Sequence, residues 1–397
     1  MKDPGVVIVG GGLAAQRCAE TLRRRGYVAP VRIVCGEPEA PYDRPPLSKA
    51  VLAGSAEEET TAFRPAGWYE EQEVELLLDA PAERLEPEAH RIVLAAGEEL
   101  TYGKLLIATG GAPRRLPFLE GYENVHYLRT LADARRLRGQ LRSGARLAIV
   151  GAGFIGQEVA ATAKGLGAEV TIIEALEVPL APILGAELGR WFADLHLEEG
   201  VRLLTGAMLA RAEGSGRVER LLLADGTAVE CDVVLVGIGT VPATSWLESS
   251  GLPGNGVEVD SHGHTGQPDV FAAGDASIPF DHRFGFYART EHWDAAAWQG
   301  AAVAKAMLGE EPGPPPPLPS FWSDQYGVRI QSVGHPQHGE QVLVEGDPAG
   351  RDFEAVFIRD GRPIAGLSVG RPRAIPALRK RIEAGHSAAS NKEEVVA

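Results

Sequence analysis

The distribution of apolar residues repeats at two places along the chain. The segments VVIVG from Val6 and RLAIVG from Arg146 are mostly apolar, and a glycine-rich turn and then apolar residues at helical spacing follow each of them. A second apolar run comes after each helix, VRIVCGE from Val31 and EVTIIE from Glu169. Short continuous apolar runs are typical of strands buried on both faces of a parallel sheet. The pattern therefore predicts two strand–turn–helix–strand units.

Later segments extend this repeat. In each half a hairpin-like stretch leads to a short apolar strand that ends in glycine, over residues 90–111 in the first half and 218–239 in the second. Asp225-Gly226 in the second stretch is a strong two-residue turn signal. The chain therefore contains two copies of one nucleotide-binding plan.

The remaining segments predict a helix, a linker and a separate sheet. A strand and tight turn end near Asp275, and a helical pattern occupies residues 291–308. The proline run at residues 310–319 predicts a stiff linker. Beyond it, alternating segments predict a β-meander, a closing helix from Ile375 and a frayed tail from Ser387. The predicted fold class is α/β, with two Rossmann-like dinucleotide-binding domains and a C-terminal α+β domain.

The glycine turns have the spacing that a pyrophosphate requires. The second turn is complete, with Gly151, Gly153 and Gly156, whereas the first has Gly10 and Gly12 followed by Ala15. In such a turn the first glycine permits the bend, the second lets the backbone approach the ligand and the third lets helix and strand pack. A lone motif of this kind is often only structural, but the strand before each turn and the helix after it favour nucleotide binding.

An acidic residue ends the second strand of each copy. Glu37 and Glu174 are placed to accept hydrogen bonds from an adenosine ribose. No arginine stands beside Glu174, and its carboxylate would repel a 2′-phosphate, so the second site is predicted to prefer NADH to NADPH. The alternative is that Glu174 is only an exposed acid at a strand end, and for Glu37 either register of the strand end is possible.

Charge and composition exclude several classes of protein. The 397 residues carry a formal net charge of −15, which argues against a nucleic-acid binder and a polybasic membrane anchor. No apolar stretch approaches the roughly 18–20 residues of a membrane span. Three glycines interrupt the apolar N-terminal run, which argues against a secretory signal. We therefore expect a cytoplasmic protein.

Cysteine and histidine spacings indicate no structural metal. Cys18, Cys35 and Cys231 are far apart in sequence and predict reduced thiols. Two histidine pairs, at residues 262 and 264 and at residues 335 and 338, fall in turn-rich loops without an evident third ligand, which favours solvated polar loops.

Six segments together resemble one enzyme family. They are PYDRPPLSK at 41–49, LLIATGG at 105–111, LRTLADA at 128–134, DVFAAGDA at 269–276, EHWDAA at 291–296 and FWSDQY at 321–326. In this order they resemble the FAD-dependent NADH:ferredoxin reductases of aromatic-ring dioxygenases and haem monooxygenases. Rubredoxin reductase and apoptosis-inducing factor are relatives with the same glutathione-reductase architecture. The resemblance implies an FAD-binding domain of residues 1–112 and 243–319, an NAD-binding domain of residues 113–242 and a C-terminal domain of residues 320–397.

The resemblance also implies which residues bind the cofactors. Those expected to contact FAD are Gly10, Gly12, Leu13, Ala14, Glu37, Arg44, Pro45, Lys49, Ala82, Thr109, Gly110, Arg129, Gly274, Asp275, Glu291, His292, Trp293 and Trp322. Those expected at NADH are Gly151, Gly153, Phe154, Ile155, Gly156, Glu158, Glu174, Gly237, Ile238 and Gly239. Lys49 and Glu158 resemble a family ion pair near flavin N5 and are the expected catalytic residues.

The implied activity is transfer of hydride from NADH to FAD and of single electrons from FAD to a ferredoxin. Disulfide reductases of this architecture carry reactive cysteines in the region that here reads EAPYDRPPLSKAVL, from Glu39, and this region has no sulfur. Two rivals stay open: an NADH oxidase, and an interaction protein like apoptosis-inducing factor. The carrier, a ferredoxin or a rubredoxin, and the oligomeric state, monomer or homodimer, also stay open. For an acidic carrier, the expected docking patch consists of Arg283, Arg289, Arg371, Arg373, Arg379, Lys380 and Arg381, although such charges are commonly only solvated.

Overall fold

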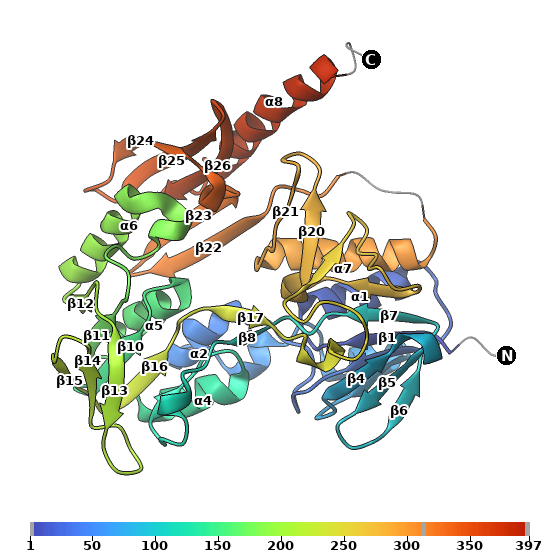
Figure 1. Ribbon diagram of the computed structural model, residues 1–397, viewed down its shortest axis with the longest axis horizontal. Coiled ribbons are helices and arrows are strands. Elements are labelled where there is room, and N and C mark those ends of the chain that lie inside the picture. Colours follow the sequence, from blue (N-terminus) through green and yellow to red (C-terminus); the bar gives the residue numbers. More distant parts are fainter. Residues whose placement is uncertain (1–3, 311–314, 394–397) are drawn as a thin grey trace. The chain divides into compact units, whose positions relative to one another are not determined.

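The computed structural model describes residues 4–310 and 315–393, with side chains as far as Gly385. Two compact units make up the chain. The first consists of residues 1–43, 59–112 and 241–319, and the second of residues 44–58, 113–240 and 320–397. The chain passes from one unit to the other five times, after residues 43, 58, 112, 240 and 319. The third and fourth of these crossings lie within two short strands, β8 (Gly111–Pro113) and β17 (Thr240–Pro242). Figure 1 labels most of the elements of both.

A five-stranded parallel sheet forms the centre of the first unit. Its strand order is β19 (Val270–Ala272), β7 (Lys104–Ile107), β1 (Val6–Val9), β2 (Val31–Val34) and β3 (Val74–Leu77). One face packs on α1 (Leu13–Arg24) and α7 (Trp293–Met307), which lie side by side (Figure 1). The other face packs on the antiparallel strands β4 (Ala82–Glu86), β5 (Arg91–Leu94) and β6 (Glu99–Thr101). Burial on both faces explains why the central strands are continuously apolar.

Smaller elements complete the first unit. Helix α3 (Ala66–Glu71) precedes β3, and a third sheet has the order β18 (Val257–Val259), β20 (Ser277–Asp281) and β21 (Phe286–Tyr287).

The second unit repeats the plan. Its parallel sheet has the order β12 (Arg202–Leu204), β11 (Glu169–Ile173), β10 (Arg146–Val150), β16 (Val233–Val236) and β9 (Val125–His126). Residues of α5 (Phe154–Gly165), α4 (Leu131–Gln140) and α2 (Ala50–Ala53) join the core on one face. The antiparallel strands β13 (Leu209–Glu213), β14 (Arg220–Leu223) and β15 (Ala228–Glu230) supply the core on the other. The two predicted copies of a dinucleotide-binding fold are confirmed.

A five-stranded antiparallel sheet also belongs to the second unit. Its order is β22 (Ser320–Gln325), β23 (Val328–Gly334), β26 (Arg362–Val369), β25 (Asp352–Arg359) and β24 (Gln341–Asp347). Helix α8 (Ile375–Glu393) packs against β26 and β23. The expected simple meander is wrong here. The chain leaves β23 for the far edge strand β24, so that β26 returns to pair with β23.

Two further elements differ from the expectation. Helix α8 continues through Glu393, so the segment from Ser387 is not a frayed tail as far as the structure describes it. Helix α6 (Ala181–Glu198), which has a kink at Gly185 (φ of +79°), was not predicted. Within the described ranges, no helix has the length and apolar character to cross a membrane.

Candidate functional site

The first glycine turn joins β1 to α1 and leaves space in front of the helix. Gly10 has φ of +123°, and a Cβ there would lie 2.1 Å from the carbonyl oxygen of Ala108, so the fold itself requires this glycine. Gly12, the N-cap of α1, differs, because a Cβ there would meet no atom within 4 Å and no side chain caps the helix. The space beside Gly12 is therefore an open cradle at the positive end of a helix, which fits a pyrophosphate.

The second turn, between β10 and α5, divides its glycines in the same way. A Cβ on Gly151 would lie 2.5 Å from the carbonyl oxygen of Gly237, and one on Gly156 would lie 2.5 Å from that of Gly151. On Gly153 the nearest atom would be 3.8 Å away, and no side chain caps α5. The second turn therefore also fits a dinucleotide pyrophosphate.

The acid at the end of β11 reaches into this turn. Glu174 is 9% exposed, and its carboxylate accepts hydrogen bonds from the backbone N–H of Ala152 at 2.6 Å and of Leu176 at 2.8 Å. In the first unit, half-buried Glu37 accepts a hydrogen bond from the Tyr42 hydroxyl. Glu174 is thus not merely an exposed strand-end acid, since it is buried and fixed at the second glycine turn.

Lys49 and Glu158, the expected catalytic pair, form an ion pair inside the second unit. Lys49 Nζ lies 2.7 Å from Glu158 Oε2, and the side chain of Glu158 is only 4% exposed. The Ser48 hydroxyl donates to Oε2 at 2.5 Å, and the Ser323 hydroxyl donates to Oε1 at 2.7 Å. Three segments therefore meet at one carboxylate: the 3₁₀ turn before Lys49, helix α5 and strand β22. A buried carboxylate needs such partners, because burial removes the water molecules that would otherwise stabilise its charge.

Two predicted arginines are also joined in the second unit. Arg44 donates a hydrogen bond to the carbonyl oxygen of Arg129 at 2.6 Å. Arg129 directly precedes Thr130, which caps α4 and forms a capping box with Asp133. The backbone N–H of Arg129 also donates to Asp133 Oδ2 at 3.1 Å. The start of α4 therefore fixes the place of Arg129, and Pro45 begins the 3₁₀ turn that leads to Lys49.

The carboxyl ends of β7 and β19 carry the next group of predicted residues, in the first unit. Thr109 and Gly110 follow β7, and within the described part of the chain the buried Thr109 hydroxyl has no hydrogen-bond partner. Gly274, with φ of +73°, and Asp275 form the turn after β19, where Gln299 accepts the Gly274 N–H at 2.7 Å. An unpaired buried hydroxyl at this edge of a parallel sheet fits a polar ligand there.

The start of α7 lies in the same unit. Trp293 is the first residue of α7, its indole N–H donates to Asp43 Oδ1 at 2.8 Å, and His292 is the N-cap. A Cβ on Gly300 would lie 2.2 Å from the carbonyl oxygen of Ala14, so α7 approaches α1 closely. The remaining predicted residues of the unit are Leu13 and Ala14 in the first turn of α1, Ala82 at the start of β4 and Glu291 just before α7.

The other predicted residues of the second unit fall at two places. Gly237, Ile238 and Gly239 follow β16, and the first turn of α5 contains Phe154 and Ile155, of which Ile155 is 48% exposed. Trp322 lies on β22, where the guanidinium of Arg329 is 5.3 Å from the centre of its indole ring.

Carboxylates neutralise part of the expected docking patch. Arg371 forms ion pairs with Asp352 and Glu354, and Arg289 forms one with Glu291. The patch is therefore less cationic than the sequence indicated.

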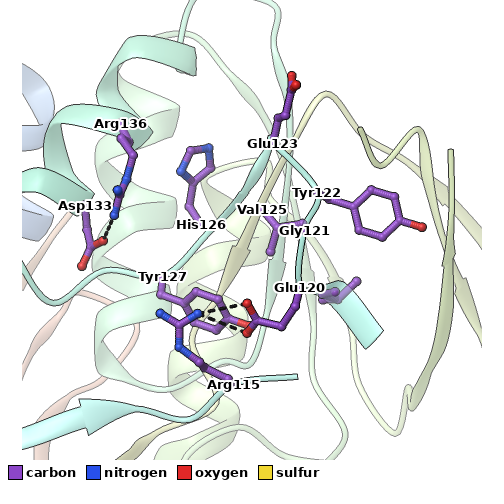
Figure 2. Close-up of a pocket in the computed structure, with 11 residues that line it drawn as sticks. Arg115, Glu120, Gly121, Tyr122, Glu123, Val125, His126, Tyr127, Asp133 and Arg136 are labelled. Atoms are coloured by element: carbon purple, nitrogen blue, oxygen red, sulfur yellow. Dashed lines mark hydrogen bonds and ion pairs between the residues drawn. The ribbon is translucent and has the colours of Figure 1, made fainter. Parts of the chain in front are cut away.

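A cavity of about 270 Å³ beside the start of α4 contains none of the predicted cofactor residues. In Figure 2, Arg115 pairs with Glu120 and lies over the ring of Tyr127, while Arg136 pairs with Asp133. Because these charges already have partners, we assign no ligand to this cavity.

Sequence reasoning missed several residues that support the site. Ser48 and Ser323 lie within the segments PPLSK and FWSDQY, but the family resemblance implies a role only for the neighbouring lysine and tryptophan. The signal for Ser323 is its place beside Gln325 in an alternating strand, where two polar residues occupy the buried face. Asp43 and Gln299 have no comparable signal, because their partners are distant in sequence.

Comparison with known proteins agrees with this geometry. Residues 4–300 match the family model for pyridine nucleotide-disulphide oxidoreductases, and residues 320–393 match the model for the reductase C-terminal domain. The chain is 40% identical to the 5,5′-dehydrodivanillate O-demethylase ferredoxin reductase subunit of Sphingobium sp. (strain NBRC 103272 / SYK-6), over 92% of this chain and 90% of that one. It is also 40% identical to the anthranilate 1,2-dioxygenase system ferredoxin–NAD(+) reductase component of Burkholderia cepacia, over 96% and 95%.

A solved structure has the same fold. The covalent putidaredoxin reductase–putidaredoxin complex contains a chain that matches with a TM-score of 0.92 and 32% identity, over 96% of this chain and 94% of that one. Matches of this length and similarity mean that the chain belongs to the pyridine nucleotide-disulphide oxidoreductase family.

Proposed function

We propose that the protein is an NADH-dependent flavoprotein reductase that delivers single electrons to a ferredoxin of an oxygenase system. The observation that carries this proposal is the pair of open glycine cradles in a chain similar, over nearly its whole length, to ferredoxin reductase components. FAD binds at the Gly10–Gly12 turn and NADH at the Gly151–Gly156 turn. The FAD-binding domain consists of residues 1–112 and 243–319, the NAD-binding domain of residues 113–242 and the C-terminal domain of residues 320–397.

Residues at the sheet edges would hold FAD. Asp275 would accept hydrogen bonds from its ribityl chain, and Arg129 would neutralise phosphate charge. The start of α7, at Trp293, would present backbone N–H groups and partial positive charge to the pyrimidine edge. The chemistry that bound FAD supplies is acceptance of a hydride from NADH and release of its electrons one at a time.

The chain's own contribution to hydride transfer is orientation and electrostatics. Lys49 places a fixed positive charge in a largely buried site, and Glu158 holds the ammonium in position. No side chain has to move a proton in this step. Gly237 and Gly239 leave room for the nicotinamide ring, and Glu174 holds the adenosine ribose and disfavours a 2′-phosphate.

The cysteines favour direct electron release over a thiol relay. Cys18, Cys35 and Cys231 are buried, and none of them is in a disulfide. Burial raises the pKa of Cys18 far above its usual value and raises that of Cys231 to about 12, so both stay protonated at neutral pH. Buried, protonated cysteines argue against a disulfide-reductase or peroxide-consuming activity, which relatives of the same fold have.

The electron acceptor is an iron–sulfur protein, a ferredoxin or alternatively a rubredoxin. The relatives named above are reductase components that serve ferredoxins. Arg373, Arg379, Lys380 and Arg381 are the basic residues that we propose for docking an acidic carrier. We place the reaction in the cytoplasm.

Steady-state turnover with and without a carrier tests the proposal. With NADH, a [2Fe–2S] ferredoxin and cytochrome c as the final acceptor, we expect cytochrome c reduction to depend on ferredoxin concentration. Oxygen uptake without ferredoxin should be slow by comparison. Fast oxygen uptake that ferredoxin does not change would favour the NADH oxidase, and an NADH-driven change in oligomeric state with slow turnover would favour the interaction protein.

A further inference from the structure

One loop of the first unit brings two histidines and an aspartate together. It joins β18 to β19 and reads DSHGHTGQPD from Asp260. Asp260, His262 and His264 each offer a ligand atom, and these three atoms lie within 4.8 Å of one another. Among the residues that the structure describes, no other such group of three His, Cys, Asp or Glu side chains occurs. The sequence showed the two histidines without a third ligand, and the fold supplies Asp260 as that ligand.

The backbone holds this loop in one shape. Asp260 Oδ1 accepts the N–H of His262 at 2.8 Å and that of His264 at 3.0 Å. Gly263 has φ of +81°, and a Cβ there would lie 2.3 Å from a methyl carbon of Val303 on α7. The buried glycine therefore faces the core, while Asp260 and His264 are exposed and His262 is half-buried. Asp260 Oδ1 therefore holds the turn, which leaves Oδ2 and a ring nitrogen of each histidine as donor atoms.

The donor atoms indicate which kind of metal ion suits this group. His264 Nδ1 lies 3.0 Å from Asp260 Oδ2, and the two imidazole rings are 6.3 Å apart between centres. Metal–ligand distances of about 2.0–2.2 Å require the donor atoms to approach one another by rotation of exposed side chains. Imidazole nitrogens with one carboxylate suit Zn²⁺, Ni²⁺ and Cu²⁺, whereas Mg²⁺ and Ca²⁺ prefer oxygen ligands only.

We propose that Asp260, His262 and His264 bind one divalent transition-metal ion at the surface of the first unit. Water completes the coordination, since the site is open to solvent. On binding, the metal ion replaces the hydrogen bond between His264 and Asp260. The proposal does not depend on the proposed reductase function, because none of the three residues belongs to either glycine turn or to the Lys49–Glu158 pair.

The chain offers a matched control. His335 and His338 form a second pair with ring centres 6.1 Å apart, but His335 is only 3% exposed and no described carboxylate completes a group of three with them. Substitution of His338 removes an imidazole from a similar pair and should leave metal binding unchanged.

Isothermal titration of the tag-free, flavin-loaded protein with ZnCl₂, after treatment with a chelator, tests the site. We expect one equivalent of Zn²⁺ to bind to the wild type. His264→Ala and Asp260→Asn should each weaken binding at least about tenfold, since they remove a ligand. Asp260→Asn keeps a side-chain oxygen for the two backbone N–H groups, so the loop is retained. His338→Ala should bind as the wild type does.

Three outcomes would overturn the proposal. They are a wild type without a one-equivalent site, loop variants that bind Zn²⁺ as tightly as the wild type, and loss of binding in His338→Ala in place of the loop variants. Circular dichroism and bound flavin check the fold of each variant. If His264→Ala does not fold, His262→Gln and Asp260→Asn decide the question.

Discussion

Glu158 is the residue on which the candidate catalytic pair depends. Its carboxylate is buried, and Lys49, Ser48 and Ser323 all contact it. A hydrogen bond to a charged group contributes about 1.5–3 kcal/mol, and a buried charge that loses a partner is strongly destabilised. We therefore propose that Ser323 is a positioning residue, which would act on the reaction only by holding Glu158 and, through it, Lys49 in place.

Replacement of Ser323 by alanine tests this role. We expect the maximal rate of flavin reduction by NADH to fall roughly ten- to hundredfold, with little change in the NADH concentration at half-maximal rate. Ser323→Thr keeps the hydroxyl and should restore most of the rate. Ser332→Ala is the matched control, because Ser332 is equally buried on the neighbouring strand and donates only to the carbonyl oxygen of Gly366. Equal rates in Ser323→Ala and Ser332→Ala would contradict the assignment.

We propose that Glu174 decides the choice between the two nicotinamide cofactors. Glu174→Gln removes the negative charge that a 2′-phosphate would meet. It keeps one side-chain oxygen, and so it keeps only one of the two hydrogen bonds that the N–H groups of Ala152 (to Oε2) and Leu176 (to Oε1) donate. We expect the ratio of kcat/KM for NADPH to that for NADH to rise about tenfold or more. Glu177→Gln, the control, removes the same charge from an exposed position of the same loop. A ratio that is the same in both variants would show that Glu174 does not face the ribose.

At the scale of elements, the turn between β1 and α1 contains one glycine that the fold requires, Gly10, and one that we propose is required only for cofactor binding, Gly12. Gly12 has extended backbone angles and free space around it, whereas Gly10 has a positive φ and faces a carbonyl oxygen. Gly12→Val should therefore give a folded protein with little bound flavin, because the side chain fills the cradle. Gly10→Val should not give folded protein. Flavin absorbance per protein and circular dichroism measure both, and a yellow Gly12→Val protein would contradict the account.

Some elements of this fold could be predicted from the sequence, and others could not. Strands β1 and β10 and their helices were predictable, because burial on both faces leaves continuous apolar runs. The order of the last sheet was not, because adjacent strands in sequence need not pair: β23 pairs with β26. Likewise Ser323 and Glu158 are 165 residues apart, and only the fold brings the hydroxyl to the carboxylate.

At the scale of the whole molecule, two copies of one nucleotide-binding plan occur in an acidic chain. Each parallel sheet has helices on one face and a three-stranded antiparallel sheet on the other. The net charge of −15 means that an acidic carrier needs local basic residues, and Arg371 is already paired with acids. Charge reversal at Arg373 therefore tests carrier docking more directly than charge reversal at Arg371, which would also break the ion pairs of Arg371.

The most direct measurement of the central claim is an anaerobic titration of the purified protein with NADH, followed by flavin absorbance. The account predicts that about one equivalent of NADH bleaches the oxidised flavin band. It also predicts that added oxidised ferredoxin restores the band and is itself reduced. A protein that contains flavin but keeps its absorbance when NADH is added would contradict the account.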